Sequence, residues 1–474
     1  MTNLYFDLDR RAKVPLHKQL IIHLKNHVLS GDIKKGEKIP SSRALAIDLK
    51  VSRIVTLAAY EQLIAEGYLI SKSGSGTFIS NNIPDTIAKS QKTYSGPKWL
   101  KPETPPEISA NRKRQKCLYD FSIGHPALSI LPKNSWKRCW RKALNHPLNI
   151  GKPAPHGELL LREEIAKYLD RSRNIKCQAD QIIITSGAAE SLRLISIATE
   201  EFSPVTYYEN PGFQIGAHWL SQGNHAIKLL DIDENGLVTA GLPEMTDRPS
   251  MLFLTPSHQF PLGFRLSLKR RNEILNWARK NDALILEDDY DSEFHYETMA
   301  LPTLKSQDET GQVLYLSSFS KSISPDVKIG YLVAPANLCE VLKHIIAREH
   351  AEPPTLSQNA LAYFIADGSL DKMIARSRRH YSKLNKIMRE KLGNLPSGIN
   401  VSGLDSGIHA FLSFSERPDK LICALKAKSF YLPVLEANSN WHGFSLGYGH
   451  FEAEHLKKAL DMLVEEIRLL YPEL

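Results

Sequence analysis

The chain of 474 residues has few cysteines and no long apolar run. Its five cysteines lie far apart, and no two of them form a Cys-x-x-Cys pair. This spacing argues against a disulfide framework, a redox motif or a zinc ribbon, so we expect reduced, mostly structural thiols and no metal site. No apolar segment approaches the roughly 20 residues that cross a bilayer, and the start MTNLYFDLDRRAKVPL lacks the apolar stretch of a signal peptide. The sequence therefore predicts a cytoplasmic protein with no membrane partner.

Excess positive charge is absent from most of the chain. The first 120 residues contain 20 Lys and Arg against 11 Asp and Glu, whereas the remaining 354 contain 40 against 41. The net charge of +8 therefore comes from the N-terminal end, as expected if that end alone meets a polyanion. A chain of this length also exceeds one compact core, which predicts two or more domains.

Three helices and a hairpin are predicted within the first 80 residues. Apolar residues recur at helical spacing over 15–31, and a second helix begins at the cap candidates Ser41 and Ser42. A third helix is expected over 52–66, and the segment YLISKSGSGTFIS (68–80) predicts the hairpin. The residues expected on the inner face of the third helix are Val55, Ala59, Leu63 and Ile64.

These elements are the parts of a winged helix-turn-helix, in which the second helix of the pair enters the major groove of DNA. Arg53 and Thr56 are expected to face outward, with Arg53 reaching guanine or a phosphate. The helix start at 41–43 and the bare amides of the hairpin tip suit phosphate contacts. A charged module that only contacts proteins is the alternative. The residues predicted to bind DNA are Ser41, Ser42, Arg43, Ser52, Arg53, Thr56, Ser73, Gly74, Ser75, Gly76 and Thr77.

The strings PSSRALA (40–46), VSRIVTLAAYEQLIAEGYL (51–69) and SGSGTF (73–78) resemble the DNA-binding domain of the GntR superfamily. After this region, residues 81–116 are rich in Pro, Ser, Asn, Thr and Lys and show no periodicity, which predicts a linker. An irregular arm packed on a domain is the alternative. The predicted organisation is a DNA-binding domain at 1–80, a linker at 81–117 and a large domain at 118–474.

The large domain is predicted to have an α/β fold. The apolar strings QIIITSG, VTYYENPG, MLFLTPSHQ, ALILEDDY and VLYLSSFSK each end in polar residues, and the segments 158–171, 188–201 and 266–281 are predicted helices between them. Such a pattern indicates a mixed, mostly parallel sheet covered by helices on both faces. In these sheets ligands bind at the carboxyl ends of the strands, where the polar residues fall.

Lys321 follows one of these strands, in SSFSKSISPDVKIGYL (317–332). Taken alone, it is most simply a surface lysine. A lysine that forms a Schiff base with pyridoxal 5'-phosphate needs a lowered pKa and nearby phosphate donors at a strand end. That cofactor also needs a carboxylate at its pyridine nitrogen, for which Asp288 is favoured over Asp289, and a donor such as Tyr290 at its phenolate oxygen.

Further strand ends supply a phosphate nest in TSGAAES (185–191) and a stacking ring at Phe213. Each of these features has a structural competitor, such as a core phenylalanine or a solvated turn. The predicted cofactor-binding residues are Lys321, Ser186, Gly187, Ala188, Phe213, His258, Asp288, Tyr290, Ser318, Ser320 and Lys328. Beyond Lys321 as the Schiff-base lysine, no catalytic residue is predicted.

The order of these features over 118–474 resembles fold-type I aminotransferases, which have a small C-terminal α+β subdomain. The strings TPSHQFPLG (255–263), EDDYDSEF (287–294) and SSFSKSISPDVKIGYL resemble the MocR subfamily, in which a GntR-type domain is fused to an aminotransferase-like domain. This resemblance implies a DNA-binding regulator that holds pyridoxal phosphate and forms a head-to-tail, domain-swapped homodimer. It also implies a response to the cofactor, an amino acid or an amine, and control of genes of vitamin B6 or of amino-acid and amine metabolism.

Three positions depart from the family pattern. Lys328 stands where an arginine normally binds the phosphate, and Lys152 or a neighbour replaces a tyrosine. Ser445 stands where an arginine would clamp a substrate carboxylate. Because turnover requires that clamp, we predict a regulator rather than an enzyme. An aminotransferase with an accessory DNA-binding domain, or a regulator without cofactor, is the alternative.

Overall fold

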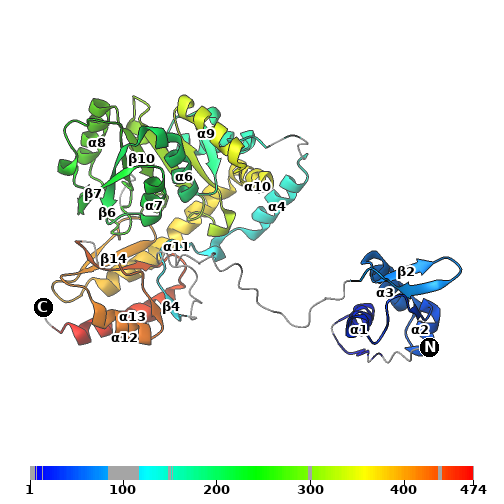
Figure 1. The fold of residues 1–474 in the computed structure, drawn as a ribbon. Coiled ribbons are helices and arrows are strands. Elements are labelled where there is room, and N and C mark those ends of the chain that lie inside the picture. Colours follow the sequence, from blue (N-terminus) through cyan, green and yellow to red (C-terminus); the bar gives the residue numbers. More distant parts are fainter. Residues whose placement is uncertain are drawn as a thin grey trace. The chain divides into compact units, whose positions relative to one another are not determined.

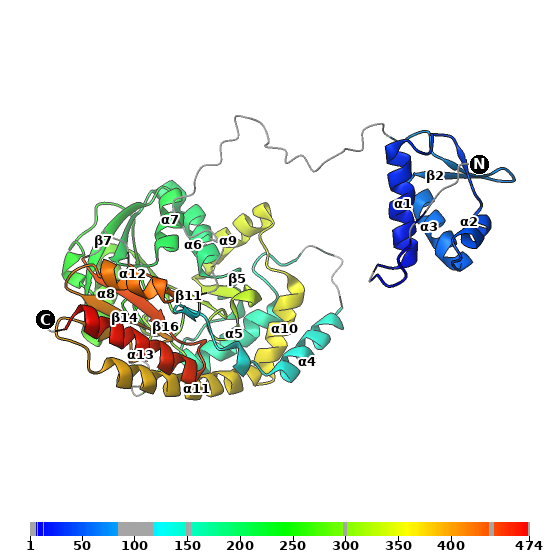
Figure 2. The same cartoon turned by 90° about the horizontal axis from the view of Figure 1, so that it is seen from below.

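The computed structural model describes residues 6, 8–12, 14–83, 117–147, 151, 153–296, 301–435 and 440–472. The chain divides into two compact units, Met1–Ala110 and Asn111–Leu474, and each is described by itself. Both are drawn in Figures 1 and 2. The expected linker at 81–117 lies outside the described residues except for 81–83 and 117.

The first unit contains the three predicted helices and the predicted hairpin. Its helices are α1 (Leu16–Ser30), α2 (Ser42–Asp48) and α3 (Arg53–Ala65), and its strands are β1 (Lys38–Ile39), β2 (Leu69–Lys72) and β3 (Gly76–Ile79). The strands form an antiparallel sheet in the order β1-β3-β2. Gly31 ends α1 with a φ of 83°, and the Ser41 hydroxyl caps α2 by accepting from the Ala44 amide at 3.2 Å.

The buried face of α3 differs from the predicted one at two positions. Its buried residues are Thr56, Ala59, Tyr60 and Leu63. Ile64, predicted to face inward, is 38% exposed, and Thr56, predicted to face outward, has no exposed surface. The Thr56 hydroxyl donates to the carbonyl oxygen of Ser42 at 2.8 Å. A hydroxyl that finds a backbone acceptor can be buried, so both predictions were wrong because packing against α2 rotates the inner face toward Thr56 and Tyr60.

An eight-stranded sheet organises the second unit. Its order is β5-β12-β11-β10-β9-β6-β7-β8. The strands are β5 (Ile182–Thr185), β6 (Val205–Asn210), β7 (Ala226–Asp233), β8 (Gly236–Leu237), β9 (Ser250–Leu254), β10 (Leu284–Asp288), β11 (Val313–Ser318) and β12 (Gly330–Val333). β12 runs antiparallel to both neighbours and β8 antiparallel to β7, whereas the other pairs are parallel. The predicted mixed, mostly parallel sheet is therefore confirmed.

Helices cover both faces of this sheet (Figure 2). Along β9, Phe253 packs in a core with Leu220 of α7 (Gln214–Gln222), while Leu252 packs in another core with Ile274 of α8 (Leu268–Asn281). Adjacent strand residues point to opposite faces, so an uninterrupted apolar strand supplies both cores. On the sheet face that α7 covers lie also α6 (Ala188–Thr199) and α9 (Ala336–Glu349). The opposite face, which α8 covers, also carries α5 (Leu159–Arg173) and α10 (Thr355–Ala366). Helix α10 in turn contacts α4 (Lys133–Leu144).

The C-terminal part, together with β4 from the start of the unit, forms a smaller α+β layer with its own core, as predicted (Figure 1, gold to red, with β4 in cyan). Its helices are α11 (Ser369–Leu392), α12 (Asp419–Ala427) and α13 (Ala453–Leu470), and its strands are β13 (Asn400–Ser402), β14 (His409–Phe414), β16 (His442–Gly447) and the parallel pair β4 (Tyr119–Asp120) and β15 (Phe430–Tyr431). Among the described residues, no helix is long and apolar enough to cross a membrane.

Candidate functional site

Lys321 lies just after β11, in a half-buried position at the carboxyl edge of the parallel strands. Its Nζ donates a hydrogen bond to the carbonyl oxygen of Gly124 at 3.2 Å. Enclosure of the amine lowers the pKa of Lys321, although the carboxylates of Asp291 and Asp288 oppose this shift. The amine is therefore held by one backbone acceptor and is more easily deprotonated than a surface lysine.

Gly124 was not found by sequence reasoning. It has a φ of 81°, and a β-carbon at this position would lie 1.9 Å from the Lys321 amine. Only the absence of a side chain leaves room for the amine. The G-H-P turn of the sequence was a possible signal, but nothing in the string connects it to a lysine so distant along the chain.

Asp288 and Asp289 at the end of β10 have different environments. Asp288 is buried, and its Oδ1 has no hydrogen-bond partner among the described residues. Burial, and next the charge of Asp289, raise the pKa of Asp288 to about 7, while Lys321 opposes the rise. Burial also acts to raise the pKa of Asp289, but an ion pair with Arg173 and a 2.6 Å hydrogen bond from the Tyr315 hydroxyl hold it below its usual value. Asp289 is thus engaged through Oδ2 by Arg173 and Tyr315, whereas its Oδ1, like Oδ1 of Asp288, has no hydrogen-bond partner among the described residues.

Tyr290 belongs to a buried network. Its hydroxyl oxygen lies 3.2 Å from Nδ1 of His258, and the same nitrogen lies 2.9 Å from Oδ2 of Asp291. The ring of His409 is 4.5 Å from that of His258, and burial, with the neighbouring His258, lowers the pKa of His409 well below its usual value. His258 and His409 each have a ring nitrogen, and Asp291 a carboxylate oxygen, that together lie within 4.8 Å of one another and could hold a metal ion. The structure thus brings the two predicted residues His258 and Tyr290 into contact. The other two members of this network, Asp291 and His409, were not predicted from the sequence.

Phe213 precedes α7 at the end of β6 and is half-buried. Its ring meets Phe260 edge-to-face at 6.0 Å, and Phe260 meets Tyr290 in the same way at 6.0 Å. The structure therefore brings Phe213 near the predicted site through Phe260, a ring the sequence analysis did not select.

The predicted phosphate nest lies where β5 ends and α6 begins. Gly187 has a φ of 121° and directly precedes the first helical residue, Ala188. A β-carbon on Gly330 would lie 2.7 Å from the Gly187 α-carbon, so the first residue of β12 packs closely against the nest. Gly330 pairs with Thr185 of β5 on one side and with Ser318 of β11 on the other, so Ser318 lies two strands away from the end of β5.

The remaining predicted cofactor residues have varied environments. Ser318 and Ser320 are half-buried, and Ser186 is exposed. Lys328 is exposed and has a φ of 51° in the left-handed region. Ser445 is buried in β16 and carries no charge, and Lys152 lies outside the described residues.

The predicted DNA-binding residues of the first unit are exposed, apart from Ser42 and Thr77, which are half-buried, and the buried Thr56. Ser52 directly precedes α3, and Arg53 is the first residue of this helix. The hairpin tip at 73–76, which connects β2 to β3, is exposed. Ile54 and Ile47, 77% and 69% exposed, accompany the charged residues on α3 and α2. The helix start and the hairpin tip thus both present surface that a DNA backbone or groove can reach.

Both parts of the chain match known families. The family of aminotransferase class I and II matches residues 120–438, and the gntR family of bacterial regulatory proteins matches residues 16–79. The multiple substrate aminotransferase from Thermococcus profundus has a TM-score of 0.69 at 20% identity, covering 77% of this chain and 96% of that chain. LysN, the alpha-aminoadipate aminotransferase from Thermus thermophilus, has a TM-score of 0.68 at 20% identity over 77% of this chain and 96% of that one. These structures show the fold.

Relatives with both parts are transcriptional regulators. The probable rhizopine catabolism regulatory protein MocR of Rhizobium meliloti is 32% identical over 80% of this chain and 78% of its own length. The HTH-type pyridoxine biosynthesis transcriptional regulator PdxR of Corynebacterium glutamicum is 31% identical over 99% of this chain and 100% of its own. The chain belongs to the family of MocR-type transcriptional regulators, in which a gntR-family helix-turn-helix is joined to an aminotransferase class I and II domain.

Proposed function

We propose that the chain is a transcription regulator of MocR type that binds operator DNA with its first unit and pyridoxal phosphate at Lys321 with its second. Pyridoxal phosphate supplies an aldehyde that an amine can capture and a ring that withdraws electrons. The observation that carries the proposal is that an enclosed Lys321 amine and an unpartnered buried oxygen of Asp288 occur at the ends of two neighbouring strands.

The residues at this edge fit the chemical groups of the cofactor. Asp288 offers its free oxygen to a protonated ring nitrogen, which would stabilise the carboxylate that burial now disfavours. Tyr290 offers a hydroxyl to the phenolate oxygen, with its position set by His258. Phe213 supports the ring by stacking.

The phosphate group would be held by the start of α6. The amides of Gly187 and Ala188 present donors at a helix N-terminus, and Ser186, Ser318 and Ser320 add hydroxyls. Lys328 contributes charge but, as a lysine, no bidentate fork. We expect this set to bind phosphate more weakly than a set with arginine.

Regulation requires only that a ligand favours one arrangement of the protein over another. We propose that the regulator works in the cytoplasm as a head-to-tail homodimer. We further propose that it responds to the cofactor or to an amine or amino acid. The similarity to PdxR, a regulator of pyridoxine biosynthesis, supports vitamin B6 genes as targets, with amino-acid and amine metabolism as the other option.

The neutral Ser445 favours sensing over turnover. A transaminase binds two successive acids and needs a cation for their carboxylate, and Ser445 supplies none. Purified protein loaded with cofactor is therefore expected to show no sustained turnover with paired amino and keto acids. Multiple turnovers would contradict this part of the proposal.

The central experiment combines a spectrum and a footprint. Pyridoxal phosphate added to the purified chain should produce a visible absorbance band that is absent in Lys321→Ala. A nuclease footprint on the DNA upstream of its own gene, with and without pyridoxal phosphate, should show a protected operator that depends on the cofactor. A spectrum unchanged by Lys321→Ala would overturn the assignment of the lysine, and a missing footprint would overturn the regulatory part.

A further inference from the structure

A small cavity in the second unit lies among residues that the proposed cofactor site does not use. Its volume is about 20 Å³, above the roughly 10–15 Å³ that a water-sized group needs. The residues that line it are Arg173, Ser257, Arg265, Ser292, His295, Leu301 and Ser406. Two guanidinium groups, three hydroxyls and an imidazole thus surround the space, and none of the seven side chains is a carboxylate.

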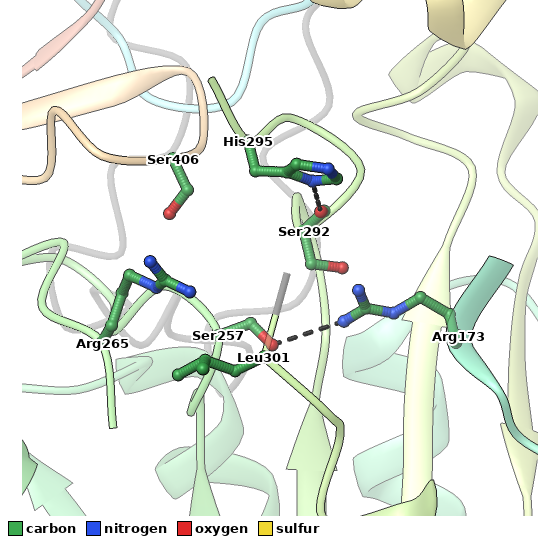
Figure 3. Close-up of a pocket in the computed structure, with 7 residues that line it drawn as sticks. All are labelled: Arg173, Ser257, Arg265, Ser292, His295, Leu301 and Ser406. Atoms are coloured by element: carbon green, nitrogen blue, oxygen red, sulfur yellow. Dashed lines mark hydrogen bonds between the residues drawn. The ribbon is translucent and has the colours of Figure 1, made fainter. Parts of the chain in front are cut away.

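Figure 3 shows the guanidinium groups of Arg173 and Arg265 and the hydroxyl of Ser406 directed toward the same space. Arg173 Nη2 donates to the Ser257 hydroxyl at 3.4 Å. Two buried polar atoms of the lining, Nε of Arg173 and Oγ of Ser406, have no hydrogen-bond partner among the described residues. Buried donors are normally paired, so these two atoms point to a missing acceptor.

Guanidinium donors lie at and beside the cavity. Arg173 and Arg265 line it, and Arg378 lines the neighbouring cleft. Asp289 pairs with Arg173, and burial, with the charge of Asp289, raises the pKa of Glu293 to about 7.

The cavity has room beside it for the rest of a ligand. A cleft of about 540 Å³ shares Arg173, Ser292 and His295 with the cavity. The cleft also has Tyr168 and Ile374 in its wall, which offer apolar contact. A ligand could thus place an acidic group in the cavity and its body in the cleft.

We propose that this cavity binds the oxyanion group, carboxylate or phosphate, of a small-molecule ligand. Arginine side chains and hydroxyls are the donors that such groups prefer. The ligand would join two layers of the unit, because Ser406 comes from the loop between β13 and β14 and bridges to His295 across an antiparallel backbone contact. The inference does not depend on a bound cofactor.

His295 offers a direct readout. Burial lowers its pKa, and the charges of Arg378, Arg173 and Arg265 lower it further. A bound anion offsets these charges, so the titration of the His295 ring, followed by NMR, should move to higher pH when the site fills.

The experiment uses the full-length chain titrated in a calorimeter with inorganic phosphate and, separately, with acetate, at constant ionic strength held with sodium chloride. Saturable binding of phosphate alone identifies a phosphate ligand, and binding of acetate identifies a carboxylate ligand. Ser406→Ala should weaken the binding by about tenfold with an unchanged melting temperature, and Arg265→Gln should weaken the binding by a similar factor. Arg279→Gln, which removes an exposed charge from α8 that pairs with Glu309, should leave it unchanged.

The cofactor's own phosphate site needs a separate control. A Ser186→Ala, Ser318→Ala double variant should retain the binding and the shift of His295. The proposal is overturned if neither anion binds saturably, if binding survives in both cavity variants, or if the double variant alone abolishes it. If Arg265→Gln does not fold, the smaller Ser406→Ala change decides the outcome.

Discussion

The side-chain amine of Lys321 donates a hydrogen bond to the backbone carbonyl oxygen of Gly124 at 3.2 Å, although the two residues are 197 positions apart. The contact joins the beginning of the second unit to the strand end that carries the lysine. The acceptor is an uncharged carbonyl oxygen, which suits an amine that must become neutral to react.

Gly124→Ala is expected to impair cofactor binding. Its β-carbon would lie 1.9 Å from the Lys321 amine, and the φ of 81° disfavours any side chain. We expect a loss of about 1–2 kcal/mol of unfolding free energy from the backbone and, in addition, loss of the visible absorbance band. Gly311→Ala is the matched control, because Gly311 has a φ of 79° and nothing within 4 Å of the added β-carbon. It should lose similar stability and keep the band; equal spectra for both variants would contradict the steric role of Gly124.

Asp288→Asn should mainly weaken cofactor binding, whereas Asp289→Asn should mainly lower the stability of the fold. Asp288 has an unpartnered oxygen, so its replacement should leave the cofactor-free fold intact and weaken pyridoxal phosphate binding by about tenfold or more. Asp289 forms a buried ion pair with Arg173, and its replacement should cost about 3–5 kcal/mol of stability. Spectrophotometric titration measures the first effect and urea unfolding the second. The assignment is wrong if Asp289→Asn keeps full stability and loses the cofactor instead.

The stability of the cofactor-free second unit should fall as pH rises from about 4 to 7. The pKa of Asp288 is about 7 in the folded chain against 3.8 for a free side chain, so over this range the folded state holds the proton that the unfolded state has lost. Asp288→Asn removes this contribution, about 4 kcal/mol at most, and should flatten the pH profile. Tryptophan fluorescence during urea unfolding reports the stability of the second unit, since five of the six tryptophans belong to it and none lies within residues 14–83. Part of the slope should remain, because the pKa values of Glu209, Glu287 and Glu293 are also raised to about 7. A profile identical to that of the unmodified chain would argue against a protonated Asp288.

Arg53→Ala should weaken operator binding by about 1–3 kcal/mol without lowering the melting temperature of the first unit. Arg53 is exposed at the start of α3, where base or phosphate contacts are made. Thr56→Val provides the contrast. It removes a buried hydroxyl bonded to the Ser42 carbonyl and should cost about 1–2 kcal/mol of stability. Gel-shift titrations over a range of salt concentrations and circular dichroism separate the two. Unchanged affinity and unchanged salt dependence in Arg53→Ala would mean that α3 is not the recognition helix.

Ser445 of β16 is buried and uncharged, whereas the guanidinium groups of Arg173 and Arg265 line the proposed anion cavity together with Ser257 and Ser406. These two residues directly precede His258 and Gly407, and a β-carbon on Gly407 would lie 2.2 Å from the His258 ring. The loops that line the cavity thus lie next to His258 of the proposed cofactor site.

Much of the candidate site was predictable because sheet topology follows from the sequence pattern. Lys321, Asp288 and the 186–188 nest each follow an apolar strand, and the carboxyl ends of parallel strands meet at one edge. Helix limits in the first unit were predictable for a similar local reason, since Ser41 and Gly31 are strong boundary residues. Gly124 and Phe260 were not predictable, because their roles depend on contacts with distant segments.

The sequence by itself determined that two differently built parts share one chain, that the second contains a mostly parallel sheet, and that acidic and basic groups gather at its strand ends. It favoured Asp288 over Asp289 but could not decide between these two neighbours in an acidic run. Tertiary structure separates them: adjacent residues point to opposite sides, and only packing brings Arg173 and Tyr315 to the side of Asp289. Packing within the first unit likewise turned Thr56 inward. Packing within the second unit placed Arg173 and Arg265 around one cavity. Local patterns specify the elements and their ends, whereas the neighbours of each side chain are set by contacts between elements far apart in the chain.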